Sequence, residues 1–356
     1  MKNILIISMV YITTVIGAGF ASGQEIVSFF IKYGNISLIG AVLVSVLLGT
    51  ALFALLVRCR RSNITDFSGY LSFCAGKRWA KFFDFLITAF MLCVFGTMTS
   101  CAAAVISDIA GIGGKYSALL VCALCFVCFC FDLNGLALVN TALSPVIIAG
   151  ITGICVYILF FRETAVFSPA VRHITDNFAV SALGYTSYNL LTAAVIAVDM
   201  SMLIKSEKDA AAAGKISAFF FFVMLILLWT VIKIYYGKID LGDVPMLTIT
   251  SHESRTARII YICILLSSVF TTAVSSGFGS IRRISAVVPL NKYLCIALVC
   301  ISGFMISGLG FSNLVEKVYR ICGTAGIALL VIIIKDYIKI KKDTKSYENK
   351  RKIKIS

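Results

Sequence analysis

The sequence predicts an all-α, polytopic membrane protein in which ten transmembrane helices form a 5+5 inverted repeat. Three observations predict this fold class: an apolar composition, ten apolar stretches of spanning length, and two stretches interrupted by polar and flexible residues. Of the 356 residues, 60% are hydrophobic and 14% are charged, and the mean hydropathy is +0.97. Soluble domains are nearer 45–50% apolar and about 25% charged, so this composition excludes a single soluble core.

The ten apolar stretches have the length that a bilayer requires, since a helix crosses the hydrocarbon core in about 20 residues. They cover residues 4–30, 36–57, 82–109, 116–131, 136–161, 179–204, 212–236, 257–281, 293–310 and 313–334. The first of them is too long to be the apolar core of a signal peptide, so we expect it to remain in the mature protein.

The stretches predict one transmembrane domain over residues 1–334, with repeat one at about 4–161 and repeat two at about 179–334. Residues 335–356 are predicted to form a basic cytoplasmic tail, because charge dominates there without apolar periodicity. We expect this tail to lie in water near anionic headgroups rather than to bind nucleic acid.

Lysine and arginine lie mostly on one side of the predicted membrane. Arg58, Arg60 and Arg61 follow the second stretch, and a dense basic run begins at Lys335. Because positively charged loops stay in the cytoplasm, the sequence predicts that both termini are cytoplasmic and that the number of spans is even.

The first stretch is interrupted near its middle by the sequence Val15-Ile16-Gly17-Ala18-Gly19-Phe20-Ala21-Ser22-Gly23-Gln24-Glu25. Each glycine weakens a helix by about 1 kcal/mol relative to alanine, and a carboxylate at membrane depth costs at least ~2.5 kcal/mol. Irregular backbone at that depth is tolerated only where it lines a cavity or is buried in protein. This pattern predicts a broken helix that forms half of a binding site.

A second interruption, Gly184-Tyr185-Thr186-Ser187-Tyr188-Asn189, lies in the sixth stretch. Five spans separate the two interruptions, so equivalent helices would cross the membrane in opposite directions. Two interrupted helices at corresponding positions of two halves indicate an inverted-repeat transporter with its site between them.

The residues Thr14 to Glu25, followed by Phe29-Phe30 and Tyr33-Gly34, resemble the signature of the YkvI-type bacterial membrane proteins of the amino acid–polyamine–organocation (APC) superfamily. The resemblance runs along the full chain and is most specific in the first stretch. It implies the LeuT-type fold with broken helices 1 and 6, in the bacterial cytoplasmic membrane, and it names no substrate.

The resemblance also implies a sodium site between the first and eighth helices. The ion would be held by the backbone carbonyls of Thr13 and Ile16, the carbonyl of Thr272, and the hydroxyls of Ser275 and Ser276. The alternative is that these serines only pack small side chains between helices. The fifth stretch has no lysine of the kind that replaces this ion in proton-coupled relatives, which favours sodium.

The substrate is expected between the two interruptions, where exposed amides at a helix end attract an anionic group. The candidate substrate-binding residues from the two interruptions are Gly17, Ala18, Gly19, Ser22, Gly23, Tyr185, Tyr188 and Asn189.

Three more polar residues, Gln24, Glu25 and Asp199, are candidates for gating or for carrying a coupling proton. An ionisable residue inside a membrane is functional by default. Glu25 could receive a substrate amine, carry a proton, or be a structurally paired charge. Asp199 could gate the protein or pair with a neighbouring lysine, and Glu316 is expected to pair with Arg320 at i, i+4.

The sequence therefore predicts a secondary active transporter, a sodium-coupled symporter of a small organic solute such as an amino acid, acting by alternating access. A membrane receptor that senses a nutrient without moving it and a proton-coupled transporter remain alternatives. An enzyme is not expected, because no catalytic constellation lies at a common depth, and no cofactor other than the coupling ion is expected. The predicted partners are the small solute and the lipid bilayer.

Overall fold

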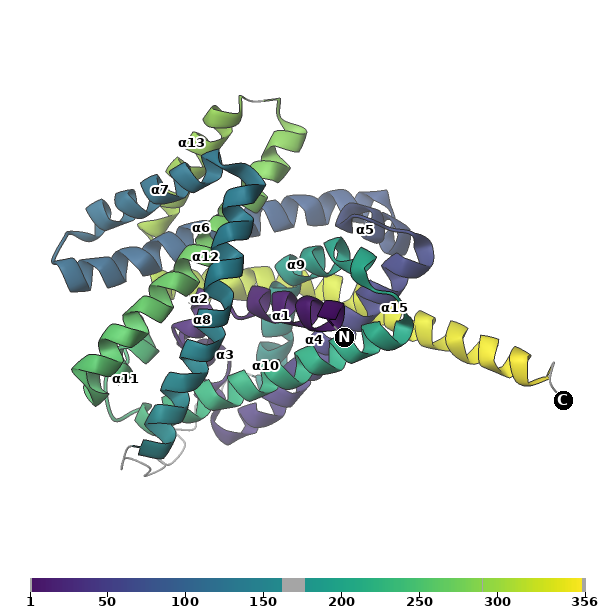
Figure 1. Cartoon of the computed structure of the whole chain (residues 1–356), viewed down its shortest axis with the longest axis horizontal. Coiled ribbons are helices and arrows are strands. Elements are labelled where there is room, and N and C mark those ends of the chain that lie inside the picture. Colours follow the sequence, from purple (N-terminus) through teal and green to yellow (C-terminus); the bar gives the residue numbers. More distant parts are fainter. Residues whose placement is uncertain (1, 162–176, 290, 354–356) are drawn as a thin grey trace.

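The computed structural model describes residues 2–161, 177–289 and 291–353 (Figure 1). Within these ranges the chain is almost entirely helical and forms no β-strand. The all-helical class that the sequence predicts is confirmed. Most of the predicted loop at 162–178 lies outside the described residues.

Two sets of helices follow one another along the chain. The first set is α1 (Lys2–Val15), α2 (Ala18–Ala21), α3 (Gln24–Phe29), the 3-10 helix η1 (Ile31–Ile36), α4 (Ser37–Ser62), α5 (Phe67–Ala75), α6 (Lys77–Ala110), α7 (Gly114–Cys130) and α8 (Asp132–Phe161). The second set is α9 (Phe178–Asp199), the 3-10 helix η2 (Ser201–Leu203), α10 (Glu207–Tyr235), α11 (Pro245–Glu253), α12 (Arg255–Val287), α13 (Lys292–Ser307), α14 (Phe311–Asn313), the π-helical turn η3 (Leu314–Val318) and α15 (Tyr319–Ile353).

Several helices begin at a side-chain cap. Asp66, Ser206 and Ser254 each accept a hydrogen bond from the backbone N–H three residues later, at the starts of α5, α10 and α12. Such caps satisfy one of the N–H groups that a helix start leaves without a partner. The polar residues between apolar stretches therefore set where these helices begin.

Six helical segments of the described chain are long and apolar enough to cross a membrane, and four more are apolar but shorter. The six are Ile31–Ser62, Lys77–Ala110, Phe178–Asp199, Glu207–Tyr235, Arg255–Val287 and Phe311–Asp343. The four shorter ones are Asn3–Val15, Gly114–Cys130, Pro145–Phe161 and Lys292–Ser307. Each overlaps one of the predicted apolar stretches.

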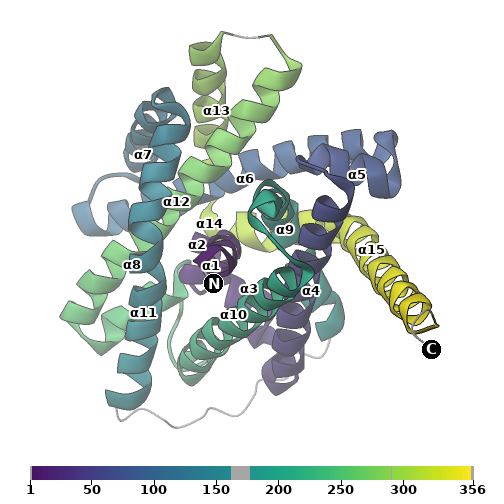
Figure 2. The same ribbon diagram turned by 45° about the vertical axis from the view of Figure 1, so that its right-hand side comes forward.

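The helices pack as two groups that each draw on both halves of the chain. One group contains α1, α4, α9 and α10, and the other contains α6, α7, α12 and α13. Helix α8 packs against α12 and α10, whereas α15 packs against α9 and α4. Figure 2 shows α1 and α2 near the centre, between α12 on one side and α4, α9 and α10 on the other. The interrupted first segment thus lies where the two groups meet.

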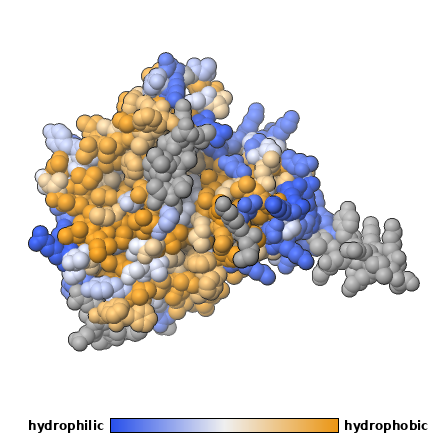
Figure 3. All heavy atoms as spheres, in the orientation of Figure 1, coloured by the Kyte–Doolittle hydropathy of each residue, from blue (hydrophilic) through white to orange (hydrophobic). Residues whose placement is uncertain are grey.

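The surface carries the apolar residues that a lipid environment accepts. Figure 3 shows hydrophobic residues over most of the described face, and hydrophilic residues gathered near the base of the protruding α15. Large side chains such as Phe85, Phe160 and Met305 are exposed on this molecule. Because lipid replaces water around a membrane span, exposed apolar side chains of this kind fit a membrane protein.

The sixth apolar stretch differs from its prediction, because α9 continues without a break through residues 184–189. Its polar side chains bond within their own helix: Thr186 Oγ1 donates to the Ala182 carbonyl at 2.9 Å, and Asn189 Nδ2 donates to the Tyr185 carbonyl at 3.0 Å. Such bonds let a polar residue remain inside a helix.

The α9 backbone at Gly184 forms no break and is instead the surface against which two glycines of α15 pack. A Cβ added at Gly323 of α15 would lie 2.6 Å from the Gly184 carbonyl oxygen, and one added at Gly326 would lie 2.8 Å from the Ser187 carbonyl oxygen. Small residues let membrane helices approach this closely. The predicted interruption of the sixth helix is therefore replaced by a tight crossing of α9 and α15.

The basic segment at the C-terminus is helical as far as Ile353, because α15 runs on through residue 335. Asp336 and Ile340 of this part are buried. The predicted division at residue 334 therefore falls inside a continuous helix, and the separate tail stays a prediction.

The crossing of α9 and α15 predicts unequal effects for two glycine-to-alanine substitutions. Gly323→Ala should lower the melting temperature of the purified protein, because its methyl group meets the α9 backbone and overpacking typically costs about 1–3 kcal/mol. Gly184→Ala should leave the melting temperature near that of the unchanged protein, because no atom lies within 4 Å of the added Cβ. Equal melting temperatures for both variants would contradict this account of the crossing.

Candidate functional site

The backbone leaves the helical conformation twice within the first apolar segment. Helix α1 ends at Val15, and Gly17 is extended with φ −78° and ψ −174°. Gly23, between α2 and α3, has φ +83°, a left-handed conformation that side chains other than glycine rarely adopt. The end of a helix leaves its last carbonyls without intrahelical partners, and α1 closes with Ile16 N–H donating to the Ile12 carbonyl at 2.7 Å.

Helix α12 lies directly beside this interruption. The Ala18 N–H donates to Thr272 Oγ1 at 3.3 Å, and a Cβ added at Gly17 would lie 3.5 Å from the same oxygen. Thr272 was predicted to contribute only its carbonyl. In the structure its hydroxyl also accepts from the start of α2, and its carbonyl accepts a hydrogen bond from Ser276 Oγ at 2.6 Å; the predicted role of the carbonyl stays a prediction.

The predicted sodium ligands are divided between the two sides of this contact. Thr13 and Ile16 belong to the end of α1, where Thr13 Oγ1 donates to backbone carbonyls of its own helix. Ser275 is half-buried and Ser276 is buried on α12, within one turn of Thr272. The fold thus places the two sets of candidate ligands on neighbouring elements, and their coordination of sodium stays a prediction.

Ser22 and Gly23 are covered by α11. Ser22 Oγ donates to the Gly19 carbonyl at 2.8 Å and accepts from the Gln24 N–H, while the Ser22 carbonyl accepts from the Met246 N–H at 3.0 Å. A Cβ at Gly23 would lie 2.8 Å from Ile232 Cδ1. The segment 237–256, which follows the seventh apolar stretch, thus contributes a helix that packs over the junction of α2 and α3.

Glu25 lies in the first turn of α3 and is only 4% exposed. Its side chain folds back over Gly19, where an added Cβ would collide with Glu25 Oε1. Glu25 Oε2 has no hydrogen-bond partner in the described protein. An unpaired carboxylate oxygen in a protein interior lowers the stability of the fold. The buried position of Glu25 is therefore better explained by a functional role than by a contribution to folding.

Tyrosine hydroxyls lie near Glu25, and their rings belong to a larger group of buried aromatic side chains. We call them the aromatic cluster: Phe29, Phe30, Phe90, Tyr185, Tyr188 and Tyr319, all of them buried. Tyr188 lies at its centre, with ring centroids 5.3 Å from Tyr185, 5.5 Å from Phe29 and 5.0 Å from Tyr319. The hydroxyls of Tyr185 and Tyr188 lie close to the Glu25 carboxylate, but neither has a well-formed hydrogen bond.

The structure brings the candidate substrate-binding residues Gly19, Tyr185 and Tyr188 together with Glu25, a gating or proton candidate; that they form one site stays a prediction. Asn189 is buried nearby on α9, but its amide group is directed to its own helix. Sequence reasoning missed Phe90 and Tyr319, which come from α6 and α15. Neither has a local pattern that sets it apart from other aromatic residues in apolar stretches.

The remaining candidates lie away from this centre or at its edge. Gln24 begins α3 and is buried beside Glu25 in the chain. Asp199 ends α9 and is exposed. Glu316, which the sequence pairs with Arg320, forms an ion pair with Lys32 at 2.8 Å, because η1 brings Lys32 to the π-helical turn that carries Glu316.

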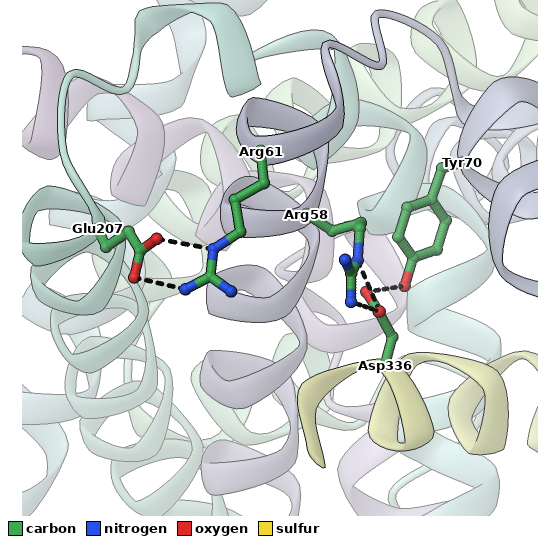
Figure 4. A network of polar contacts seen from close by, with 5 residues as sticks. All are labelled: Arg58, Arg61, Tyr70, Glu207 and Asp336. Carbon is green, nitrogen blue, oxygen red and sulfur yellow. Dashed lines mark hydrogen bonds and ion pairs between the residues drawn. The ribbon is translucent and has the colours of Figure 1, made fainter. Parts of the chain in front are cut away.

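A second polar group, which the sequence did not indicate, ties α4 to three other helices (Figure 4). Arg58 Nε donates to Asp336 Oδ1 at 2.7 Å, and Tyr70 Oη donates to Asp336 Oδ2 at 3.4 Å. Arg58 and Asp336 are each 6% exposed. Nearby, Arg61 makes a two-pronged contact with the more exposed Glu207, at 2.7 and 2.9 Å.

Several solved structures have a similar fold. The chain aligns with Mhp1, a nucleobase-cation-symport-1 family transporter in a closed conformation, over 95% of this chain and 78% of that one, with a TM-score of 0.65 and 15% identity. A variant of the Eremococcus coleocola manganese transporter aligns with a TM-score of 0.62 and 12% identity, over 92% of this chain and 77% of that one. A Na+-coupled sialic acid symporter in a substrate-bound outward-open state aligns with a TM-score of 0.58 and 15% identity, over 91% of this chain and 75% of that one. The fold is that of the LeuT-type transporters.

Two curated proteins of Bacillus subtilis (strain 168) are similar over nearly the whole chain. The uncharacterized membrane protein YkvI is 25% identical over 329 residues, which cover 91% of this chain and 93% of YkvI. The uncharacterized protein YyaD is 23% identical over 322 residues, 90% of this chain and 93% of YyaD. No family model matches the chain. The resemblance to YkvI-type membrane proteins is confirmed.

The ion pairs at the end of α4 predict a contrast in stability. Asp336→Ala should lower the melting temperature strongly, because removing one partner of a buried pair costs about 3–5 kcal/mol and leaves Arg58 uncompensated. Glu207→Ala should change it little, because exposed pairs contribute about 0–1 kcal/mol. The measurement is the melting temperature of each variant in the same detergent. An Asp336→Ala protein as stable as Glu207→Ala would contradict a structural role for the buried pair.

Proposed function

We propose that the protein is a secondary active transporter, a sodium-coupled symporter that moves a small organic solute such as an amino acid by alternating access. The observation that carries this proposal is the interruption of the first apolar segment, opposite α12, at the junction of the two helix groups. One of the solved structures with this fold is a sialic acid symporter that is coupled to sodium. The same fold here supports coupled transport rather than a channel or an enzyme.

The proposed topology has ten spans with both termini in the cytoplasm of a bacterial plasma membrane. Ten apolar helical segments support it, together with the positive charge near the ends of α4 and α15. Each of the four shorter segments would cross the membrane together with residues that adjoin it in the chain. In the first span, for example, α2 and α3 would extend α1. The domain would cover residues 1–334, with the remainder as the basic tail.

The proposed sodium site uses the carbonyls of Thr13 and Ile16 and oxygens of Thr272, Ser275 and Ser276. The contact of Thr272 with Ala18 supports it, because that contact brings α12 to the end of α1. Ser276 already donates its hydroxyl proton to the Thr272 carbonyl, so its lone pairs are available to accept a cation.

A proton-coupled transporter is the second candidate, and Glu25 is the observation that favours it. A buried carboxylate is a group that can carry a proton across the membrane. The two mechanisms differ in which residue governs coupling: Ser275 and Ser276 for sodium, or Glu25 for a proton.

Sodium should stabilise the protein through the serines of α12. In sodium chloride, the melting temperature of the purified protein should exceed that in potassium chloride at equal ionic strength. Ser275→Ala with Ser276→Ala should remove most of this difference. Ser267→Ala, whose hydroxyl bonds to the Cys263 carbonyl on the same helix, serves as the matched control and should retain it.

An unchanged sodium effect in the double variant would place the ion elsewhere. A solute that binds purified protein but shows no uptake into proteoliposomes would support a receptor instead of a transporter.

A further inference from the structure

The Glu25 carboxylate is the feature from which a further inference follows. It is 4% exposed, its Oε2 atom has no hydrogen-bond partner in the described protein, and it lies in the first turn of α3. Buried polar groups in native proteins are nearly always paired, and each exception needs a specific reason. A carboxylate without a partner at this depth is suited to a ligand that supplies the missing charge.

Basic side chains nearest this region in the fold are engaged elsewhere. Lys32 of η1 binds Glu316 at 2.8 Å. Lys233 of α10 donates to Asn35 at 2.5 Å and lies 4.9 Å from the centroid of the Trp229 ring. The groups close to the Glu25 carboxylate are instead the hydroxyls of Tyr185 and Tyr188. Within the described residues no ion pair to Glu25 is seen, so a bound cation can supply its counter-charge.

The walls around Glu25 are aromatic. Tyr188 and Phe90 have ring centroids 6.0 Å apart, and Phe90 and Tyr319 have centroids 5.5 Å apart. Aromatic faces attract organic cations through their negative quadrupole, most strongly where water is excluded. Two tyrosine hydroxyls without well-formed partners, Tyr185 Oη and Tyr188 Oη, can accept hydrogen bonds from N–H groups of such a cation.

Part of the first interruption is already engaged and is closed to a carboxylate on the ligand. The Ala18 N–H, one of the amides expected to hold an anionic group, already donates to Thr272. The amides of Ala21 and Ser22 donate to the Gly17 and Ala18 carbonyls at 3.0 and 2.8 Å.

We infer that Glu25 and the aromatic cluster form the binding site for an organic ammonium cation, with Glu25 as its counter-ion and no requirement for a carboxylate on the ligand. This inference rests on the proposed transport function and narrows its solute from amino acids in general to positively charged amines. Tyr188 would lie against the ammonium group, and Gly19 would provide the space into which the Glu25 side chain folds.

The test is a binding screen on the purified, full-length protein in sodium-containing buffer, with matched sets of probes. One set is choline, its neutral carbon isostere dimethylbutanol, and glycine betaine, which adds a carboxylate. A second set is phenethylammonium, phenylethyl alcohol and free phenylalanine, and a third is butylammonium, butanol and butyrate. The melting temperature at increasing probe concentration gives the apparent affinity.

The expected result is that stabilisation comes from one or more of the cations and not from the neutral or carboxylate-bearing members of the same set. Glu25→Gln should weaken the binding of that cation by about tenfold or more, because a charge-assisted contact is lost. Phe90→Leu should weaken it by a smaller factor, about threefold, because one aromatic wall is lost. Glu316→Gln, which removes a carboxylate from a more exposed ion pair, is the matched control and should bind as the unchanged protein does.

Folding is checked with the same measurement. Without a probe, Glu25→Gln should melt at the same temperature as the unchanged protein or higher, since it replaces an unpaired buried charge by a neutral group of similar shape. Glu25→Asp provides a second variant that retains the charge and should retain preference for cations.

Three outcomes would overturn the inference: stabilisation by neutral or carboxylate-bearing probes, cation binding that is unchanged in Glu25→Gln, or no stabilisation by any cation. A Glu25→Gln protein that keeps cation binding but loses the pH dependence of uptake would assign Glu25 to proton coupling. Failure of the proposed function is distinguishable, because cation binding without flux in proteoliposomes would leave the site in place and refute transport.

Discussion

Backbone polar groups cannot remain unpaired at the depth of a bilayer, and the interruption of the first apolar segment exposes several of them. Its neighbours supply the partners. Thr272 of α12 accepts from the Ala18 N–H, Met246 of α11 donates to the Ser22 carbonyl, and the Tyr261 hydroxyl donates to the Ala21 carbonyl. The positions of α11 and α12 against the centre therefore follow from the need to satisfy this backbone, and the buried position of Glu25 follows from theirs.

The charges of the protein divide into two kinds. Arg58 and Asp336 are buried but paired, so their role is to hold α4 and α15 together. Glu25 is equally buried and lacks a partner for one oxygen. At one end of α4 the cost of burying a charge is offset by an ion pair within the protein. At Glu25 the described residues provide no such pair, which is why the proposed site lies at the centre and not at the ion pair.

Sequence reasoning succeeds where the signal is local. The glycines around residue 17, the carboxylate of Glu25 and the tyrosines of α9 were identifiable because each is unusual within its own apolar stretch. Sequence reasoning fails where the role of a residue depends on a contact with a residue far away in the chain. Gly184 resembles a break as much as a packing residue, and only Gly323 of α15 decides between them. Arg58 and Asp336 are 278 positions apart, so each looks like an ordinary charge at the end of a span.

The aromatic cluster has one more consequence. Phe90 belongs to the helix group of α6 and α12, whereas Tyr188, whose hydroxyl lies near Glu25, belongs to the group of α1 and α9, and the centroids of the two rings are 6.0 Å apart. A ligand bound between these two rings would connect the two helix groups reversibly. Its binding energy would then favour the arrangement in which both helix groups contact it. Binding of the ligand and the relative position of the two groups would therefore be thermodynamically linked.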